Sequence, residues 1–257
     1  MMAEKAWKCL IVDDMHEALF PILAQAGILA DYQPWITVPE LGAALADCQV
    51  LVIRSKARVN RQLLGLAPEL RLVARAGAGT DNVDVEALQE RGIGLVNAPE
   101  GNRDAVAEHT LAMLLCLLNH LHTADRQVRN KVWKREANRG TELGGKTVGI
   151  IGYGHMGQAF AKRLSSFGCT VLAYDKYHPN FEEAYAQSST MEQICNQADV
   201  VSLHIPLTAE THQLVNEEWI SQFRKPVVLL NTSRGDVVQL AAVCQALQSG
   251  RVSAAAL

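Results

Sequence analysis

The residues with the clearest capacity for chemistry form a glycine-rich turn in the second half of the chain. Gly152, Gly154 and Gly157 follow an apolar, β-branched run, residues 146–151, and residues 158–167 then carry apolar side chains at helical spacing. In such a unit the first glycine allows the tight turn, the second lets a pyrophosphate approach the backbone, and the third lets helix and strand pack closely. The N–H groups at the helix N-terminus attract phosphates. The pattern predicts a dinucleotide site, and a structural turn without a nucleotide is the alternative.

An acidic residue stands where such a unit needs one. Asp175 follows the second apolar run, residues 170–174, and lies 18 residues after Gly157. A carboxylate there accepts hydrogen bonds from the ribose hydroxyls of NAD and repels the 2′-phosphate of NADP. The sequence therefore favours NAD. Lys176 is adjacent, however, and an ammonium group attracts that phosphate, so the choice of cofactor stays open.

Two polar loops follow apolar runs in the first hundred residues. Arg54, Ser55 and Lys56 supply a guanidinium, a hydroxyl and an ammonium group, which suit a carboxylate or a phosphate. A solvated polar turn explains these three residues equally well. Residues 75–84 read RAGAGTDNVD, and the small residues let successive backbone N–H groups point at an anion. The Asp and Asn residues also suit the cap of a helix expected over 85–91, and both interpretations can hold together.

The composition excludes several classes of function. The chain has 257 residues, of which 49% are hydrophobic, and its net charge is −3, so neither a nucleic acid nor a membrane surface is an expected partner. No apolar run approaches the roughly 20 residues that span a bilayer. The six cysteines are scattered without a CxxC pair or zinc-ligand spacing, which predicts reduced thiols in a cytoplasmic protein and no metal site.

The elements that must position these residues alternate between strands and helices. This rhythm predicts parallel sheets with helices on their faces and ligands at the carboxyl ends of the strands. The segment Asn97-Ala98-Pro99 interrupts the rhythm and predicts two domains, residues 1–97 and 98–257. The expected strands cover residues 8–12, 50–53, 70–74, 94–97, 146–151, 170–174, 200–204, 227–230 and 252–257. The expected helices cover residues 17–26, 39–45, 85–91, 102–121, 158–167, 190–197, 217–222 and 240–248.

A charged segment follows the long helix expected over residues 102–121. Residues 122–144 are polar and charged, and Trp133 stands alone among basic residues. A lone tryptophan in such a segment is a local packing anchor or an interface residue. We favour a contact between two copies of the chain.

Several sequence blocks line up along the chain and together resemble one family. The resemblance is to the D-isomer-specific 2-hydroxyacid dehydrogenases, closest to their D-3-phosphoglycerate dehydrogenase branch, and it covers nearly the whole chain. It implies an α/β fold with a Rossmann nucleotide-binding lobe and a flavodoxin-like substrate lobe. Both lobes have parallel sheets, and the last elements of each are expected beyond the end of the sequence. The blocks are RSK at 54–56, RAGAGTDNVD at 75–84, NAPEGNRDAVAEHTLAMLL at 97–115, GTELGGKTVGIIG at 140–152, the turn unit at 146–175, HIPLTAETHQLVN at 204–216 and LLNTSRGDVV at 229–238.

The resemblance also implies the roles of individual residues. Arg234 matches the catalytic arginine of the family, which holds the substrate carboxylate and polarises the carbonyl, a task that suits a planar guanidinium. The implied substrate-binding residues are Arg54, Ser55, Lys56, Ala78 and Gly79. The implied cofactor-binding residues are Ala78, Gly152, Tyr153, Gly154, His155, Met156, Gly157, Asp175, His204, Ile205, Pro206, Thr232, Ser233 and Arg234.

The implied activity is the transfer of a hydride between the nicotinamide of NAD and a D-2-hydroxy acid, with 3-phosphoglycerate, and hence serine biosynthesis, as the expected substrate and role. The alternatives are a hydroxypyruvate or glyoxylate reductase and an NAD-sensing module without catalysis. In the family a Glu and a catalytic His follow a stretch like VSAAAL. We therefore expect the triad to be incomplete before Leu257 and this chain to bind NAD without normal turnover. The family also implies a homodimer formed through the nucleotide-binding domain.

Overall fold

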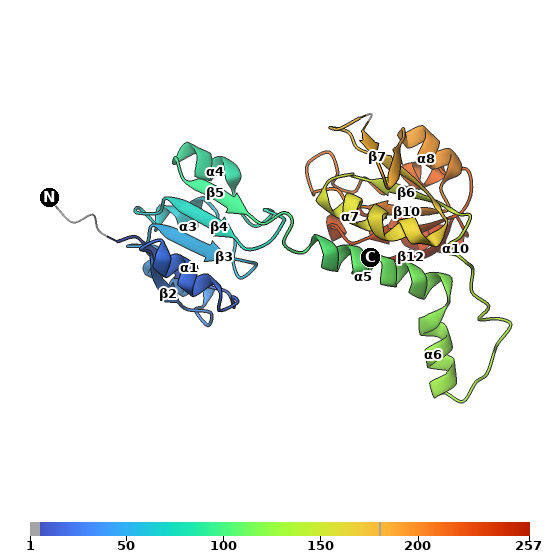
Figure 1. The fold of residues 1–257 in the computed structure, drawn as a ribbon, viewed down its shortest axis with the longest axis horizontal. Coiled ribbons are helices and arrows are strands. Elements are labelled where there is room, and N and C mark those ends of the chain that lie inside the picture. Colours follow the sequence, from blue (N-terminus) through green and yellow to red (C-terminus); the bar gives the residue numbers. More distant parts are fainter. Residues whose placement is uncertain (1–5, 180) are drawn as a thin grey trace. The chain divides into compact units, whose positions relative to one another are not determined.

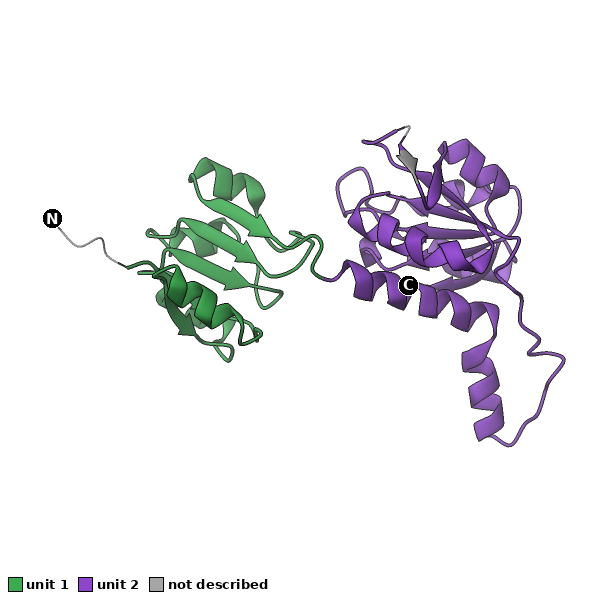
Figure 2. Cartoon of the chain, in the orientation of Figure 1, with its two compact units in different colours: residues 1–101 green, residues 102–257 purple. Residues whose placement is uncertain are grey.

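The break after Asn97 separates two α/β units. The computed structural model describes residues 6–179 and 181–257, and the chain divides into unit 1, residues 1–101, and unit 2, residues 102–257 (Figure 2). The boundary follows Gly101 rather than Asn97, because residues 99–102 form turns before the first helix of unit 2 begins. Each unit is built around its own sheet, as the alternation of strands and helices predicts.

Unit 1 contains a five-stranded parallel sheet in the order β2-β1-β3-β4-β5 (Figure 1). This is the flavodoxin-like order, so the predicted fold of the first lobe is confirmed. The strands are β1 Lys8–Ile11, β2 Leu29–Tyr32, β3 Val50–Ile53, β4 Leu72–Arg75 and β5 Gly94–Asn97. The helices are α1 Leu19–Gln25, η1 Val38–Glu40, α2 Leu41–Leu45, α3 Arg61–Gly65 and α4 Val85–Glu90.

The sheet of unit 1 separates two apolar clusters. Helices α2, α3 and α4 contribute to the larger cluster, and α1 contributes to the smaller one. All four residues of β3 are buried, as expected for a central parallel strand. Asp84 caps α4 by accepting a hydrogen bond from the N–H of Ala87 at 2.9 Å. The capping role expected in the segment 75–84 therefore falls to Asp84.

Unit 2 contains a seven-stranded sheet in the order β12-β11-β10-β6-β7-β9-β8. The strands pair in parallel except β8, which pairs antiparallel with β9. The order β9-β7-β6-β10-β11-β12 corresponds to 3-2-1-4-5-6 in a doubly wound sheet, so the predicted Rossmann fold is confirmed. The strands are β6 Thr147–Ile151, β7 Thr170–Tyr174, β8 Glu182–Glu183, β9 Ala186–Ser188, β10 Val200–Leu203, β11 Val227–Asn231 and β12 Val252–Ala256.

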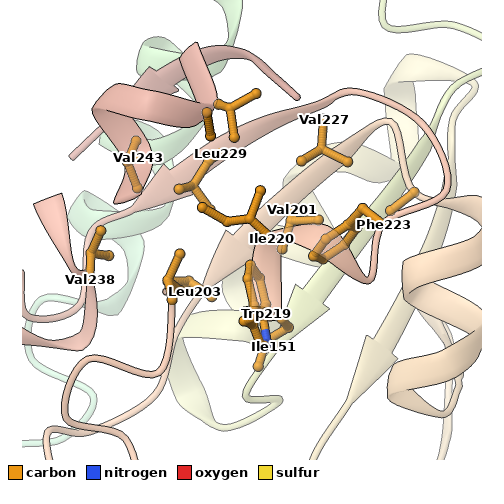
Figure 3. Packing of buried hydrophobic residues seen from close by; sticks show 14 of the residues in the cluster. Ile151, Val201, Leu203, Trp219, Ile220, Phe223, Val227, Leu229, Val238 and Val243 are labelled. Atoms are coloured by element: carbon orange, nitrogen blue, oxygen red, sulfur yellow. The ribbon is translucent and has the colours of Figure 1, made fainter. Parts of the chain in front are cut away.

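Helices cover both faces of this sheet. Helices α5 and α7 contribute to one apolar cluster, and α8, α9 and α10 contribute to the other. Figure 3 shows Trp219, Ile220 and Phe223 packed near Val201 and Leu203 of β10. The helices are α5 Arg103–Leu118, α6 Leu121–Arg129, α7 His155–Leu164, η2 Ser165–Phe167, α8 Met191–Gln197, α9 Glu217–Ser221, η3 Gly235–Val237 and α10 Leu240–Gln248.

The predicted end of the long helix over residues 102–121 is wrong. Helix α5 ends at Leu118, and α6 begins at Leu121 after a turn in which His120 has φ 52°. This left-handed conformation redirects the chain, so α6 and the segment after it project from the body of unit 2 (Figure 1). The prediction missed α6, in which polar and charged residues outnumber apolar ones and no residue is buried.

Candidate functional site

The glycine-rich turn joins β6 to α7, and the structure shows why glycines occupy it. Gly152 has φ +91°, and a Cβ atom there would lie 2.5 Å from the carbonyl oxygen of His204. A Cβ atom on Gly157 would lie 2.2 Å from the carbonyl oxygen of Gly152. Both positions therefore require glycine for close backbone packing. A Cβ atom on Gly154 would meet nothing within 4 Å, so this glycine faces open space at the N-terminus of α7.

Asp175 follows β7 and is bound to the same turn. Its carboxylate accepts hydrogen bonds from the backbone N–H groups of Tyr153 at 2.8 Å, Tyr177 at 2.9 Å and His178 at 3.1 Å. Burial alone would raise the pKa of Asp175, but the three N–H donors outweigh it and lower the pKa below its ordinary value. The carboxylate is therefore ionised at neutral pH, and its remaining lone pairs can accept hydroxyl groups.

A pocket of about 530 Å³ opens beside this carboxylate and is called the Asp175 pocket. The ends of β6, β7 and β10 contribute to its wall, and β6 lies between β7 and β10 in the sheet. This is the point at which the strand order reverses, where open α/β sheets bind their ligands. The sequence-predicted cofactor residues in its lining are Gly152, Gly154, Asp175, His204, Ile205 and Pro206.

His204 belongs to the wall of the Asp175 pocket, but its ring is turned toward the protein interior. Its Nε2 lies 2.9 Å from the hydroxyl of Ser202, and its ring centroid lies 5.5 Å from that of Phe160. Burial lowers the pKa of His204 to about 4, so the ring is neutral at physiological pH. The ring therefore packs in the core, while the backbone of His204 borders Gly152.

The remaining residues of the turn divide between the core and the surface. The side chain of Tyr153 is 4% exposed and stacks on Phe181 with the ring centroids 4.2 Å apart. Gly157 is buried under the turn, Met156 is partly buried, and His155 is exposed at the start of α7. A role of Tyr153 in cofactor binding would therefore involve its backbone, since its ring fills the core.

A second pocket, called the Arg234 pocket, lies at the end of β11 and measures about 650 Å³. Thr232, Ser233 and Arg234 line it from the loop after the strand. Helix α5 contributes several residues on the other side, including Val106 and His109. The structure thus brings a guanidinium and two hydroxyl side chains together within unit 2.

Asn231 holds the loop that carries Arg234. Its side chain is buried, and its Nδ2 donates to the carbonyl oxygen of Arg234 at 2.8 Å. Its Oδ1 accepts from the backbone N–H of Ser233 at 3.0 Å and from the Ser233 hydroxyl at 2.6 Å. Arg234 donates in turn from Nη1 to the carbonyl oxygen of Ser233 at 2.8 Å. The sequence prediction missed Asn231, although an amide at the end of a wholly apolar strand is a usable signal.

Thr110 connects this loop to α5. It is fully buried, and its hydroxyl lies 2.9 Å from that of Thr232 and donates to the carbonyl oxygen of Val106 at 2.8 Å. The sequence prediction missed this residue too. A threonine among the apolar residues of a long helix gives a weaker signal, because the bond back to the preceding turn satisfies its hydroxyl in any helix.

In unit 1, the predicted substrate residues at the end of β3 are in different environments. Arg54 and Ser55 are exposed. The ammonium group of Lys56 instead donates to the carbonyl oxygens of Pro34 and, at 3.2 Å, Ile36. Asn82 donates to the carbonyl oxygen of Arg54 at 3.1 Å, which joins this loop to the segment 75–84. Substrate binding by these residues stays a prediction.

The last residue of β4, Arg75, is a cation that the sequence prediction did not select. The guanidinium of Arg75 lies against Gly77, where a Cβ atom would come within 1.4 Å of Nη1. The Nε of Arg75 is buried without a hydrogen-bond partner among the described residues. Asn97 fixes the loop by donating to the carbonyl oxygen of Ala78 at 2.7 Å. The guanidinium of Arg75 therefore lies against the loop of small residues at 77–79. In the sequence, a cation that directly precedes a glycine-rich loop is the signal that could have identified Arg75.

Two other features are absent from residues 6–179 and 181–257. This part of the chain holds no group of three His, Cys, Asp or Glu side chains that could bind a metal ion. It also contains no helix long and apolar enough to cross a membrane. All six cysteines are unpaired.

Comparisons with known proteins agree with this geometry. Residues 111–257 match the family model described as D-isomer specific 2-hydroxyacid dehydrogenase, NAD binding domain. The D-3-phosphoglycerate dehydrogenase of Methanocaldococcus jannaschii is 36% identical over 256 residues, which cover 97% of this chain and 48% of that protein. The enzyme of the same name from Mycobacterium tuberculosis is 40% identical over 228 residues, which cover 87% of this chain and 43% of that protein. The chain thus spans about half the length of these curated relatives.

A solved structure shows the same arrangement of elements. The crystal structure of D-lactate dehydrogenase from Aquifex aeolicus, complexed with NAD and lactic acid, superposes with a TM-score of 0.84 at 28% identity. The superposition covers 96% of this chain and 75% of that one. The fold that carries the two pockets is therefore shared with a dehydrogenase that contains NAD.

Proposed function

Because the chain belongs to the D-isomer specific 2-hydroxyacid dehydrogenase family and contains its NAD-binding domain, we propose that unit 2 binds NAD across the Asp175 and Arg234 pockets for hydride transfer to or from a D-2-hydroxy acid. NAD supplies the hydride acceptor or donor at its nicotinamide ring. One observation carries the proposal: the ionised carboxylate of Asp175 and the unobstructed backbone of Gly154 line the same pocket.

The two ends of the cofactor fit different groups of the chain. The space in front of Gly154 suits the pyrophosphate, since the N-terminus of α7 presents N–H groups there. Asp175 is the acceptor for the ribose hydroxyls of the adenosine half. Thr232 and Ser233 then flank the nicotinamide half, and Ile205 and Pro206 border the adenine.

Arg234 is the proposed catalytic residue. Asn231 holds its backbone carbonyl, and its Nη1 donates to the carbonyl oxygen of Ser233. A planar fork binds a carboxylate through two parallel hydrogen bonds and stabilises negative charge that develops on a neighbouring carbonyl oxygen. The proton for that oxygen requires a general acid. By resemblance to the family, this is a histidine paired with a glutamate.

For the substrate we propose 3-phosphoglycerate, whose carboxylate and phosphate both require cations. Unit 1 offers Arg54 and Arg75 together with the backbone of Ala78 and Gly79 at the ends of neighbouring strands. The relatives named D-3-phosphoglycerate dehydrogenase support this choice. The roles of Ser55 and Lys56 are proposed on the same grounds.

The test is a steady-state assay that follows NADH absorbance with 3-phosphoglycerate, hydroxypyruvate and glyoxylate as separate substrates. The protein is the product of the whole gene that encodes these residues. Activity with 3-phosphoglycerate is expected. The substitution Arg234→Lys should lower kcat/KM by about 100-fold or more, because an ammonium group cannot replace the fork. Activity with neither 3-phosphoglycerate nor the two oxo acids would overturn the enzymatic proposal, and activity with an oxo acid alone would reassign the substrate.

We further propose a homodimer that forms through unit 2 in a cytoplasmic protein. Leu121 and Val128 lie two turns apart on the projecting helix α6 and are 51% and 54% exposed, and Trp133 beyond it is 79% exposed. Apolar side chains of this size on a projecting segment favour a protein partner. The unpaired cysteines support a reducing compartment. Sedimentation of the wild-type chain and Trp133→Ala tests the dimer, and a monomeric wild-type chain would contradict it.

A further inference from the structure

Lys176 raises a question that the sequence cannot answer. It follows Asp175 directly, and an ammonium group there is suited to bind the 2′-phosphate that distinguishes NADP from NAD. In the structure its Nζ forms an ion pair with the carboxylate of Glu210, from the loop after β10. The ammonium group also lies 5.8 Å from the centroid of the Tyr177 ring. Lys176 thus has a partner before any ligand arrives.

This ion pair lies at the rim of the Asp175 pocket. Asp175, Lys176 and Glu210 all line it, although Glu210 is 34 residues away from Lys176 in the sequence. Both side chains of the pair are more than half exposed, at 54% and 63%. Within the lining that the structure describes, Lys176 is the only lysine or arginine. The histidine of that lining, His204, is neutral at physiological pH because its ring is buried.

The loop that carries Glu210 has a defined shape. Thr211 donates from its hydroxyl to the carbonyl oxygen of Pro206 at 2.6 Å, and the N–H of Thr208 donates to the Thr211 hydroxyl at 2.8 Å. These bonds close the loop on itself immediately beside Glu210. The carboxylate is therefore presented to Lys176 by a folded loop and not by a long extended segment.

We propose that Glu210 is a specificity-determining residue, which neutralises Lys176 at the rim of the pocket and so denies a ribose 2′-phosphate its cation. The inference rests on the proposed binding of NAD in the Asp175 pocket. A 2′-phosphate adds about −2 charges beside Asp175 and requires a free cation to offset the repulsion. Glu210 competes with the phosphate for that cation. Discrimination against NADP is thus shared between Asp175 and Glu210.

The test is a fluorescence titration of the 257-residue chain with NADH and with NADPH at pH 8 and low salt. The variant Glu210→Gln should bind NADPH about threefold more tightly than the wild-type chain, with NADH affinity unchanged. The gain should shrink at higher salt, because the groups are exposed.

A double-mutant cycle separates the proposed mechanism from a simple charge effect. In a Lys176→Gln background, Glu210→Gln should no longer improve NADPH binding, because no cation is released. An equal improvement in that background would show that Glu210 acts by its own charge and would overturn the inference. The matched control is Glu136→Gln, which removes an exposed ion pair with Arg139 outside the pocket lining and should leave both affinities unchanged.

The remaining outcomes are also decisive. If the wild-type chain binds NADH but Glu210→Gln leaves NADPH affinity unchanged, the inference fails and the proposed cofactor site stands. If the wild-type chain binds neither dinucleotide, the proposed cofactor site fails and the inference fails with it.

Discussion

The Asp175 pocket and the Arg234 pocket lie in one unit but are held by different forces. Behind the Arg234 pocket, the buried side chains of Asn231 and Thr110 fix the loop through hydrogen bonds. At the rim of the Asp175 pocket, the exposed pair of Lys176 and Glu210 controls the charge. Breaking a buried hydrogen bond lowers the free energy of unfolding substantially, so such bonds fix the position of the loop. Changing an exposed charge affects which ligand binds but has little effect on the free energy of unfolding. If the two proposals hold, substitutions at the rim should change cofactor preference without disturbing the loop that carries Arg234.

The largest effect should follow the loss of the amide behind Arg234. Asn231→Ala removes one donor and one acceptor and leaves buried backbone groups of the loop without partners. The free energy of unfolding should fall by about 3 kcal/mol, measured by urea denaturation. The matched control Asn216→Ala removes a helix cap at Trp219 and should cost about 1 kcal/mol. Equal losses in the two variants would contradict the special role of Asn231.

His204 tests whether the Asp175 pocket also depends on a buried group. Its folded pKa is about 4, below the ordinary value of 6.5, because burial disfavours the charged ring. As the pH falls below 6.5, the unfolded chain binds a proton that the folded chain does not, so the stability present above pH 6.5 is lost as the pH approaches 4. This group alone should cost about 2 kcal/mol between pH 7 and pH 5. Urea denaturation at the two pH values measures it.

The control for that experiment is His204→Gln, which cannot titrate. Its loss of stability between pH 7 and pH 5 should be smaller than that of the wild-type chain by about the same 2 kcal/mol. Identical pH dependences would mean that the ring of His204 is protonated in the folded protein.

A smaller effect is expected from the hydroxyl that joins α5 to the loop. Thr110→Val keeps the shape of the side chain but loses the hydrogen bond to Thr232, and should lower the free energy of unfolding by about 1 kcal/mol. Thr110→Ser keeps the hydroxyl and should retain more of the stability, apart from the lost methyl group. Urea denaturation of both variants decides the point, and a stable Thr110→Val variant would weaken the contrast between the pockets.

The smallest effect on stability is expected from a substitution at the rim of the Asp175 pocket. Lys176→Gln should leave the urea midpoint of unfolding unchanged within error, because both partners of the ion pair are exposed to solvent. A clear shift in the midpoint would show that the pair also supports the fold. The two pockets would then not differ in the way proposed.

Local patterns in the sequence were sufficient for the central strands of both sheets and for the glycine-rich turn. Apolar runs predict the central strands, and the spacing of the glycines with Asp175 defines a unit whose parts are close in the chain. The predictions missed β2 and α3, which have four and five residues. Strand β2 has no buried residue, so tertiary pairing with β1 decides its structure and no apolar pattern marks it. The break at His120 carries no glycine or proline to signal it.

By itself, the sequence determined the family, the parallel sheets and the types of residue around the cofactor site, because each depends on residues that are neighbours or are set by a repeated pattern. Only the tertiary structure showed that Lys176 is paired with Glu210, that the ring of His204 faces the core, and that Asn231 and Thr110 support the loop of Arg234. In each case the interacting groups come from different elements of the fold. The strength of these ion pairs and hydrogen bonds depends on the distance between the groups and on their burial, and both are set only when the chain folds.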